Sequence, residues 1–270
     1  MTATRRPWLR HGLRLLGLLL LCTLCLQLVF IARIALMNVI DPQSTSFQRS
    51  EAWRLLTSQG RILWSQDWVD DAALSANLKR AVIASEDAGF SDHSGVEWDA
   101  IEKAWQRNQK NEARAERQQQ RQQQRQQAQQ TRQSQPSKRP NPSRPVSVRL
   151  VGGSTITQQL AKNLFLSGER TALRKAQELL LTFYLEALLS KPRILSIYLN
   201  NVEWGEGIFG AQAAARHYFR TDAGKLGPAQ AARLAVMLPA PKRFEQRPGS
   251  PYLLGRSGAV QARMGDVALP

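Results

Sequence analysis

The chain reads GGSTITQQLAKN from Gly152 to Asn163, and this stretch decides the fold because it specifies a helix start beside an anion-ready loop. Gly152 and Gly153 free the backbone for a close approach, and Ser154 or Thr155 can cap the helix that follows. The first turn of a helix offers unpaired N–H groups and a positive dipole end, which favour phosphate. We therefore predict the edge of an anion-binding active site here.

The helix after this cap is amphipathic. Apolar residues recur every four positions, at Ile156, Leu160 and Leu164, and mark its buried stripe. Gln158 and Lys162 lie four residues apart on a neighbouring face, which places a cation on the helix. An ordinary capped helix with solvated glutamines would show the same pattern, so residues elsewhere in the chain must decide between the two interpretations.

A second polar run lies upstream and reads AVIASEDAGFSDHSG from Ala81 to Gly95. Its short apolar stretch delivers Glu86 and Asp87 into a turn rich in glycine and serine. A glutamate at the end of an apolar element is partly shielded from water, which raises its pKa toward the range useful for acid or base catalysis. Adjacent carboxylates are also common as surface charge, so this pair alone assigns no function.

In this order, the two runs resemble the family 51 glycosyltransferases, the peptidoglycan transglycosylases that polymerise lipid II. The upstream run fits that family's motif Glu-Asp-x-x-Phe-x-x-His-x-Gly, and the run from Gly152 fits its second motif. Two further pieces resemble the remaining motifs: RKAQE, from Arg174 to Glu178, and KPRILSIYLN, from Lys191 to Asn200. Four motifs in the same order make the resemblance specific.

The resemblance covers roughly residues 72–243 apart from one insertion, and the segment after Asn200 is most similar to monofunctional biosynthetic members. It implies a mainly α-helical, lysozyme-like glycosyltransferase domain with a small membrane-facing lobe. It also implies an inverting transfer, in which the 4-hydroxyl of one lipid II attacks the growing glycan and undecaprenyl pyrophosphate leaves. The chain holds no Ser-x-x-Lys or Lys-Thr-Gly signature of a penicillin-binding domain, so we expect one enzymatic domain.

The resemblance also assigns the two carboxylates. Glu86 matches the general base that removes the hydroxyl proton, a role worth typically ~10²–10⁴-fold in rate. Glu178 matches the second essential carboxylate, which organises a basic cluster or helps to hold a divalent cation, Mg or Mn. With Arg174 and Lys175 one turn earlier, Glu178 would also form ordinary helix ion pairs. No organic cofactor is expected.

Other residues carry over as binding or supporting groups. The cations that match pyrophosphate-binding positions are Lys162, Arg170, Arg174 and Lys175. We expect Gln158 and Ser154 to contact sugar or pyrophosphate. The supporting residues are Asp87, Phe90, His93 and Asn163, and the histidine is interpreted as a hydrogen-bonding residue, not as a second base. Gln177 stands where the family commonly has a basic residue, a loss that would weaken the phosphate cluster.

The N-terminal segment predicts a membrane anchor. Between Leu15 and Ala32 the chain is apolar except for Thr23 and Gln27, and at ~1.5 Å per residue this stretch covers about 27 Å, near the thickness of a hydrocarbon core. The arginines before it predict a cytoplasmic N-terminus and a periplasmic catalytic domain, in the inner membrane of the cell. A cleaved signal peptide is the main alternative, but no clean cleavage pattern follows.

Much of the net charge of +16 lies in one insertion. From Arg107 to Arg149 the chain is almost all Gln, Arg, Ser, Pro and Lys, a composition that cannot bury a core. We interpret residues 107–147 as a disordered insertion that touches anionic lipid headgroups or wall polymers, with an idle low-complexity loop as an equal alternative. The expected partners are lipid II, the glycan strand, membrane lipids and other wall-synthesis and division proteins, with no nucleic acid.

The predicted organisation has six parts. They are a cytoplasmic basic tail (1–14), the anchor (15–37), the first part of the glycosyltransferase domain (38–106), the insertion (107–147), the second part of the domain (148–245) and a C-terminal tail (246–270). Two rival functions are a lytic, lysozyme-like enzyme that cleaves glycan, and a catalytically weak membrane scaffold of the wall-synthesis machinery.

Local patterns predict helices nearly throughout. Pro192 and Pro228 each fit a first helical turn, and leucines and a tyrosine from Leu173 to Leu188 mark a helical stripe. One short strand is expected near residues 61–64. The run GEGIFG from Gly205 to Gly210 is expected to form a tight loop, not a dinucleotide site, because it follows a helix-like segment.

Overall fold

The computed structural model describes residues 7–99, 154–166, 168 and 171–270, with isolated positions 102, 106, 109, 110, 117 and 121 between them. The predicted insertion at 107–147 falls almost wholly outside the described residues, as do Gly152, Gly153 and Arg170. The chain divides into two units, residues 1–96 with 155–270, and residues 97–154. The contacts described below belong to the first unit.

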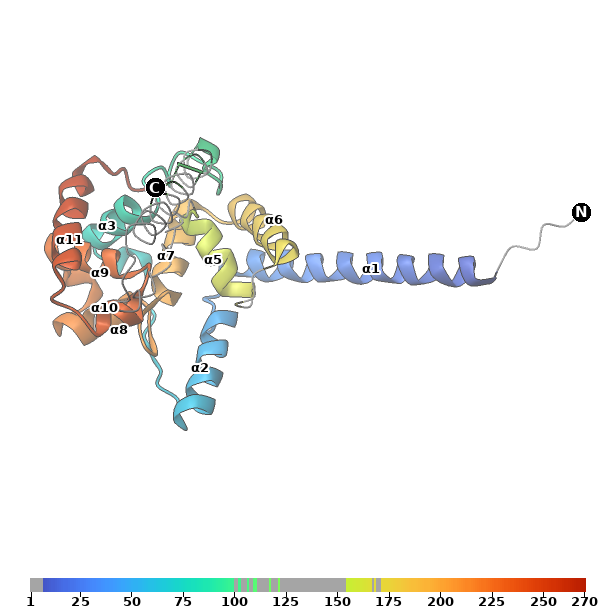
Figure 1. The fold of residues 1–270 in the computed structure, drawn as a ribbon, viewed down its shortest axis with the longest axis horizontal. Coiled ribbons are helices and arrows are strands. Elements are labelled where there is room, and N and C mark those ends of the chain that lie inside the picture. Colours follow the sequence, from blue (N-terminus) through green and yellow to red (C-terminus); the bar gives the residue numbers. More distant parts are fainter. Residues whose placement is uncertain are drawn as a thin grey trace, which may run out of the picture. The chain divides into compact units, whose positions relative to one another are not determined.

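Helix α1 (Pro7–Leu36) contains the predicted anchor. Its segment His11–Leu36 is long and apolar enough to cross a membrane, which is compatible with a single-pass anchor. Every side chain from residue 11 to residue 26 is exposed, including both cysteines, and Figure 1 shows α1 extending away from the other helices of its unit. The many exposed leucines of this segment suit a helix surrounded by lipid.

The rest of the unit is mainly helical, as expected. Its helices are α2 (Ser46–Gln59), α3 (Ala76–Glu86), α5 (Ile156–Phe165), α6 (Ala172–Leu188), α7 (Lys191–Asn201), α8 (Ala211–Phe219), α9 (Pro228–Met237), α10 (Pro241–Glu245) and α11 (Pro251–Arg263), with 3-10 turns at Asp71–Ala73, Ala223–Lys225 and Met264–Asp266. Serine or threonine caps begin α2, α3, α5, α6, α7 and α11. Pro192 and Pro228 lie in first helical turns, so both predicted starts are confirmed.

The core forms where α3 packs against α9 and α11 covers both, an arrangement visible in Figure 1. Leu78 and Val82 of α3 are fully buried there. Leu253 and Val260 of α11 are also fully buried, because their spacing of seven residues places them on one helix face. The expectation of a C-terminal tail at 246–270 is therefore wrong, since this segment supplies a core helix.

Two other local expectations also need correction. The segment Gly205–Gly210 is not a plain loop, because β2 (Glu203–Gly205) pairs antiparallel with β3 (Ile208–Phe209) around it. The strand expected at 61–64 lies slightly later, at β1 (Ser65–Gln66), and pairs parallel with β3. Gly207 makes the turn at φ 73°, where an added Cβ would lie 2.5 Å from the Leu63 carbonyl oxygen.

The buried face of α6 differs from the predicted stripe. Leu173 is 82% exposed, whereas Glu178, Leu181, Thr182 and Leu185 are buried. The apolar residues of α6 extend around much of the helix, so their spacing alone did not identify the face that meets the core. The result is a buried carboxylate on α6 and exposed leucine at its start.

Candidate active site

Glu86 is the last residue of α3, and it is only partly buried. Burial raises the pKa of its carboxyl group above the ordinary value, and the neighbouring charge of Asp87 acts in the same direction. Hydrogen bonds from Gln159 Nε2 to Oε2 at 3.1 Å and from Ser85 Oγ to Oε1 at 3.3 Å oppose this shift, as does the charge of Arg256. The site thus holds a carboxylate shielded from bulk water.

Asp87 ties the loop after α3 to the start of α5. Its buried carboxylate accepts the backbone N–H of Ile156 at 3.0 Å and Nε2 of His93 at 2.8 Å. Because Gly95 N–H donates to His93 Nδ1 at 3.0 Å, the proton of the ring lies on Nε2. The start of α5, which the sequence predicted to bind an anion, therefore already binds the carboxylate of Asp87.

Gly95 closes this loop against α6. Its φ of 84° suits glycine, and an added Cβ would lie 2.7 Å from Glu186 Cγ and from Thr182 Cγ2. Its carbonyl accepts the hydroxyl of Thr155 at 2.6 Å. Thr155 is also the N-cap of α5, so the cap residue holds both its helix and the Glu86 loop.

Two polar residues that the sequence analysis did not select lie behind Glu86. The hydroxyl of Tyr198, a fully buried residue of α7, donates to Gln159 Oε1 at 2.8 Å. This contact directs the Gln159 amide nitrogen to Glu86. Gln158, which was expected to contact substrate, is buried and its Oε1 accepts the N–H of Thr155 at 3.3 Å. Thr155 and Gln158 have the Thr-x-x-Gln spacing of a capping box. This spacing could have shown from the sequence that Gln158 caps the helix and that Gln159 is the glutamine available to the site.

A basic cluster lies at the start of α6. Glu178 is buried, with Oε2 accepting Arg174 Nη1 at 2.9 Å and Oε1 accepting Lys175 Nζ. Lys162 of α5 has an exposed side chain, yet partial burial lowers the pKa of its ammonium group. The charge of Glu178 opposes that shift, while Arg174 and Lys175 reinforce it, so the four groups lie within electrostatic reach of one another. A cationic patch of this kind suits a phosphorylated ligand.

Helix α5 joins the carboxylate to this cluster. Gln159 and Lys162 are three residues apart and therefore neighbours on one helix face. Gln159 donates a hydrogen bond to Glu86, and the negative charge of Glu178 raises the pKa of Lys162. Arg174 Nε is buried and has no hydrogen-bond partner within the described part of the chain. A buried donor without a partner, on a guanidinium grouped with two lysines, is a natural place for an anionic oxygen.

The surroundings of Glu178 do not fit a divalent cation. Both carboxylate oxygens already accept from side-chain cations, and Lys162 adds a third positive charge. Divalent metals prefer sites that gather several oxygen ligands, whereas these donors are nitrogens that carry protons. We therefore derive no step through a metal.

The remaining predicted residues are placed as follows. Phe90 is fully buried, and Lys191 Nζ lies 4.5 Å from its ring centroid. Asn163 is partly buried on α5, and Ser154 is exposed. Arg170 lies outside the described residues. Roles for these residues toward substrate stay predictions.

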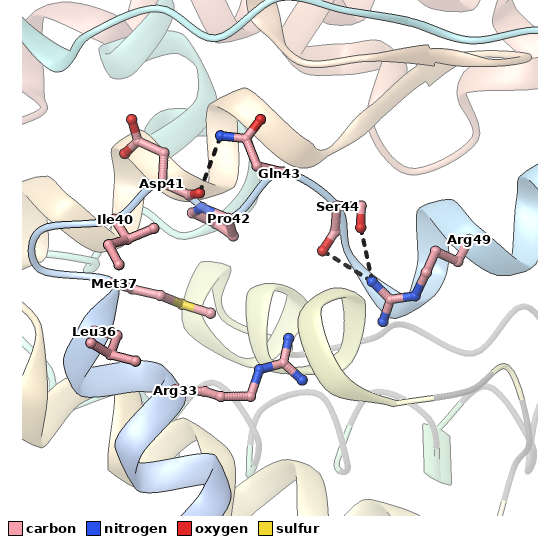
Figure 2. Close-up of a pocket in the computed structure, with 9 residues that line it drawn as sticks. All are labelled: Arg33, Leu36, Met37, Ile40, Asp41, Pro42, Gln43, Ser44 and Arg49. Atoms are coloured by element: carbon pink, nitrogen blue, oxygen red, sulfur yellow. Dashed lines mark hydrogen bonds between the residues drawn. The ribbon is translucent and has the colours of Figure 1, made fainter.

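A cavity of about 280 Å³ lies elsewhere, where α1 meets the segment leading to α2. Figure 2 shows its lining residues: Arg33, Leu36, Met37, Ile40, Asp41, Pro42, Gln43, Ser44 and Arg49. The guanidinium of Arg49 donates to the carbonyl and hydroxyl oxygens of Ser44. None of the predicted catalytic or binding residues lines this cavity, so it is not the site built around Glu86.

Comparisons with known proteins agree with the motifs. A family model described as Transglycosylase matches residues 58–131 and 146–265. The chain is 45% identical to the biosynthetic peptidoglycan transglycosylase of Paraburkholderia xenovorans (strain LB400) over 274 residues, covering 100% of both chains. It is 48% identical to that of Burkholderia thailandensis over 247 residues, covering 92% of this chain and 83% of the relative, and 43% identical to that of Bordetella avium over the whole of both chains.

Proposed function

The chain belongs to the transglycosylase family, as a monofunctional biosynthetic peptidoglycan transglycosylase of cell wall synthesis, and from this premise we propose that it polymerises lipid II with release of undecaprenyl pyrophosphate. The observation that carries the proposal is the link along α5. The shielded Glu86 carboxylate accepts a hydrogen bond from Gln159 of α5. One helical turn further along α5, Lys162 lies close to the charges of Arg174, Lys175 and Glu178.

In the proposed reaction Glu86 acts as the general base. Its carboxylate accepts the proton of the acceptor 4-hydroxyl as that oxygen bonds to the anomeric carbon of the growing strand. The bond between this carbon and the pyrophosphate oxygen breaks, and the configuration inverts. A pKa raised by burial moves the base toward the working pH, where proton transfer is most effective.

The leaving group gains negative charge as its bond breaks. Lys162, Arg174 and Lys175 are the described cations that would stabilise this charge, and Arg170 stays a predicted fourth. Glu178 holds Arg174 and Lys175 in place, which fits a role in organising the cluster. The unpaired Nε of Arg174 supplies a donor that a pyrophosphate oxygen can accept.

The lipid-linked substrate fits the surface of α6 and the anchor. Leu173 and Phe183 of α6 are 82% and 42% exposed, which suits a lobe that faces the membrane. We propose that α1 crosses the inner membrane with the N-terminus in the cytoplasm and the catalytic unit in the periplasm.

A lytic activity is the weaker candidate. Glycoside hydrolysis uses two carboxylates that flank the scissile bond. Asp87 is committed to Ile156 and His93, and Glu178 is committed to Arg174 and Lys175, so neither offers a free second carboxylate.

The test is an assay of the purified full-length protein with labelled lipid II in detergent, with penicillin present. The proposal predicts polymeric glycan that lysozyme digests, together with release of undecaprenyl pyrophosphate. Shortening of preformed glycan strands without consumption of lipid II would support the lytic alternative. Absence of both products would contradict the proposed reaction and favour the scaffold.

A further inference from the structure

The anchor and α6 run side by side in the same direction. Gln27 and Gln177 exchange two amide hydrogen bonds, from Gln27 Nε2 to Gln177 Oε1 at 3.1 Å and from Gln177 Nε2 to Gln27 Oε1 at 3.2 Å. Further along, Asn38 Nδ2 donates to the Leu188 carbonyl at 3.0 Å. Both contacts join residues 150 positions apart, so the segments stay in register over about three helical turns.

The amide pair lies at the N-terminal end of the contact between α1 and α6. Phe30 packs edge-on against Phe165 with centroids 5.3 Å apart, and Ile34 and Met37 are buried. These positions and Gln27 follow one stripe of α1. On the described part of α1, side chains before Gln27 are exposed, so Gln27 is where the anchor first meets the catalytic unit.

The position of Gln27 along α1 places the pair toward the end of the anchor that meets the catalytic unit. Between Arg14 and Arg33, which bracket the apolar stretch, Gln27 is thirteen residues from Arg14 and six from Arg33. Both amides are partly buried between α1 and α6, so each depends on the other for its hydrogen bonds. The reciprocal bonds with Gln177 supply one donor and one acceptor to each side chain.

Gln177 lies beside the basic cluster of α6 but is not part of it. It precedes Glu178, which holds Arg174 and Lys175. Its amide pairs with the anchor and not with this cluster. The pair is therefore a contact between the anchor and the helix that carries the cations.

We propose that the Gln27–Gln177 pair is a positioning lock that fixes the Arg174–Lys175–Glu178 cluster at the membrane depth where a lipid-linked pyrophosphate lies. This inference rests on the proposed function. Gln27 and Gln177 are positioning residues, because they act through α6 and not on the reacting atoms. Loss of the pair therefore affects capture of membrane-bound substrate and leaves the chemical step intact.

The test compares Gln27→Leu, Gln177→Leu and the double variant with the wild type, all full-length. With long-chain lipid II in phospholipid vesicles, each single variant should raise KM about tenfold at nearly constant kcat, the effect of losing about 1.4 kcal/mol of polar contact. The double variant should be no worse than either single one, because both remove the same interaction. Thr23→Leu, one turn earlier on the exposed surface of α1, is the matched control and should equal the wild type.

A water-soluble short-chain analogue of lipid II separates positioning from general damage, because it needs no fixed depth. The single variants should use it as well as the wild type does. The lock would be overturned if the single variants lost activity on this analogue, or if they kept wild-type activity on lipid II in vesicles. It would also be overturned if the double variant were impaired about a hundredfold in vesicles, because the two losses would then be independent. A wild type inactive on both substrates would contradict the proposed function, and the cross-linking test described next would then decide the lock by itself.

Cross-linking reads the contact without activity. With Cys22 and Cys25 replaced by serine, Gln27→Cys and Gln177→Cys should be joined by a short bis-maleimide in vesicles. Val29→Cys with Gln177→Cys is the control, since Val29 lies on an exposed face of α1 and should remain uncoupled. Equal cross-linking of the two pairs would contradict the register on which the lock depends.

Discussion

The hydroxyl of Tyr198 donates to Gln159 Oε1 at 2.8 Å, and this contact settles which end of the Gln159 amide faces Glu86. Burial raises the pKa of the Tyr198 phenol well above its ordinary value, so the tyrosine keeps its proton and remains a donor. Gln159 consequently presents N–H to Glu86 Oε2. A fully buried residue of α7 thereby controls the environment of the proposed base.

Removal of the Gln159 amide should move the acid limb of the pH profile. A hydrogen bond from Gln159 stabilises charged Glu86 and lowers its pKa, opposing the effect of burial. In Gln159→Leu the pKa should rise, so kcat/KM should fall at acidic pH and recover at higher pH. Tyr198→Phe should shift the limb in the same direction by less. The measurement is kcat/KM for lipid II across pH, and an unchanged acid limb in Gln159→Leu would contradict the relay.

Glu178 should control the alkaline limb through Lys162. Its charge raises the pKa of Lys162, which burial lowers. In Glu178→Gln the pKa of Lys162 should therefore fall further, and activity that needs the ammonium group should decline at a lower pH. Lys162→Arg in the same background should restore the alkaline limb, because an arginine keeps its proton. If the arginine does not restore it, Lys162 is not the group that titrates.

Gly95→Ala should destabilise the folded protein. The substitution forces an L residue to φ 84° and places Cβ 2.7 Å from two atoms of α6, which we expect to cost about 2–3 kcal/mol. Gly60→Ala tests the backbone effect alone, since Gly60 also has positive φ but open space around it. Gly249→Ala, which meets neither constraint, is the control. Thermal unfolding should rank them in that order, and equal midpoints for Gly95→Ala and Gly249→Ala would refute the close packing.

Glu203 should make stability depend on pH. Burial raises the pKa of its carboxyl group from its ordinary value to about 7. Because the folded protein binds this proton more tightly than the unfolded chain, the associated stability is present at acidic pH and is lost as pH rises through about 7. Glu203→Gln removes the titration, so it should raise the thermal midpoint more at pH 8 than at pH 5. An equal change at both pH values would show that Glu203 does not titrate in this range.

Local chemistry made much of the fold predictable. Thr155 and Pro228 mark helix starts through interactions with their own turns, and both predictions are confirmed. The face that a helix turns to the core depends on distant partners, so the exposed Leu173 and the core helix α11 could not be predicted from spacing alone.

Some residues of the candidate site could be predicted from the sequence, and others depend on contacts between distant helices. The motif resemblance selected Glu86, and Glu178 with its two cations, and the structure brings Glu178, Arg174 and Lys175 together. It did not select Gln159 or Tyr198, since their contact requires α3, α5 and α7 to meet. Gln177 was interpreted as a lost cation, whereas its amide pairs with a residue of the anchor remote in sequence.

The most direct test of the central claim compares wild type with Glu86→Gln in polymerisation and in binding of lipid II. The variant keeps the shape of the side chain and an oxygen acceptor but cannot take up the hydroxyl proton. We predict that it binds lipid II within about twofold of the wild type and loses about 10²-fold or more in polymerisation rate. Polymer formation at near the wild-type rate would show that Glu86 is not the general base.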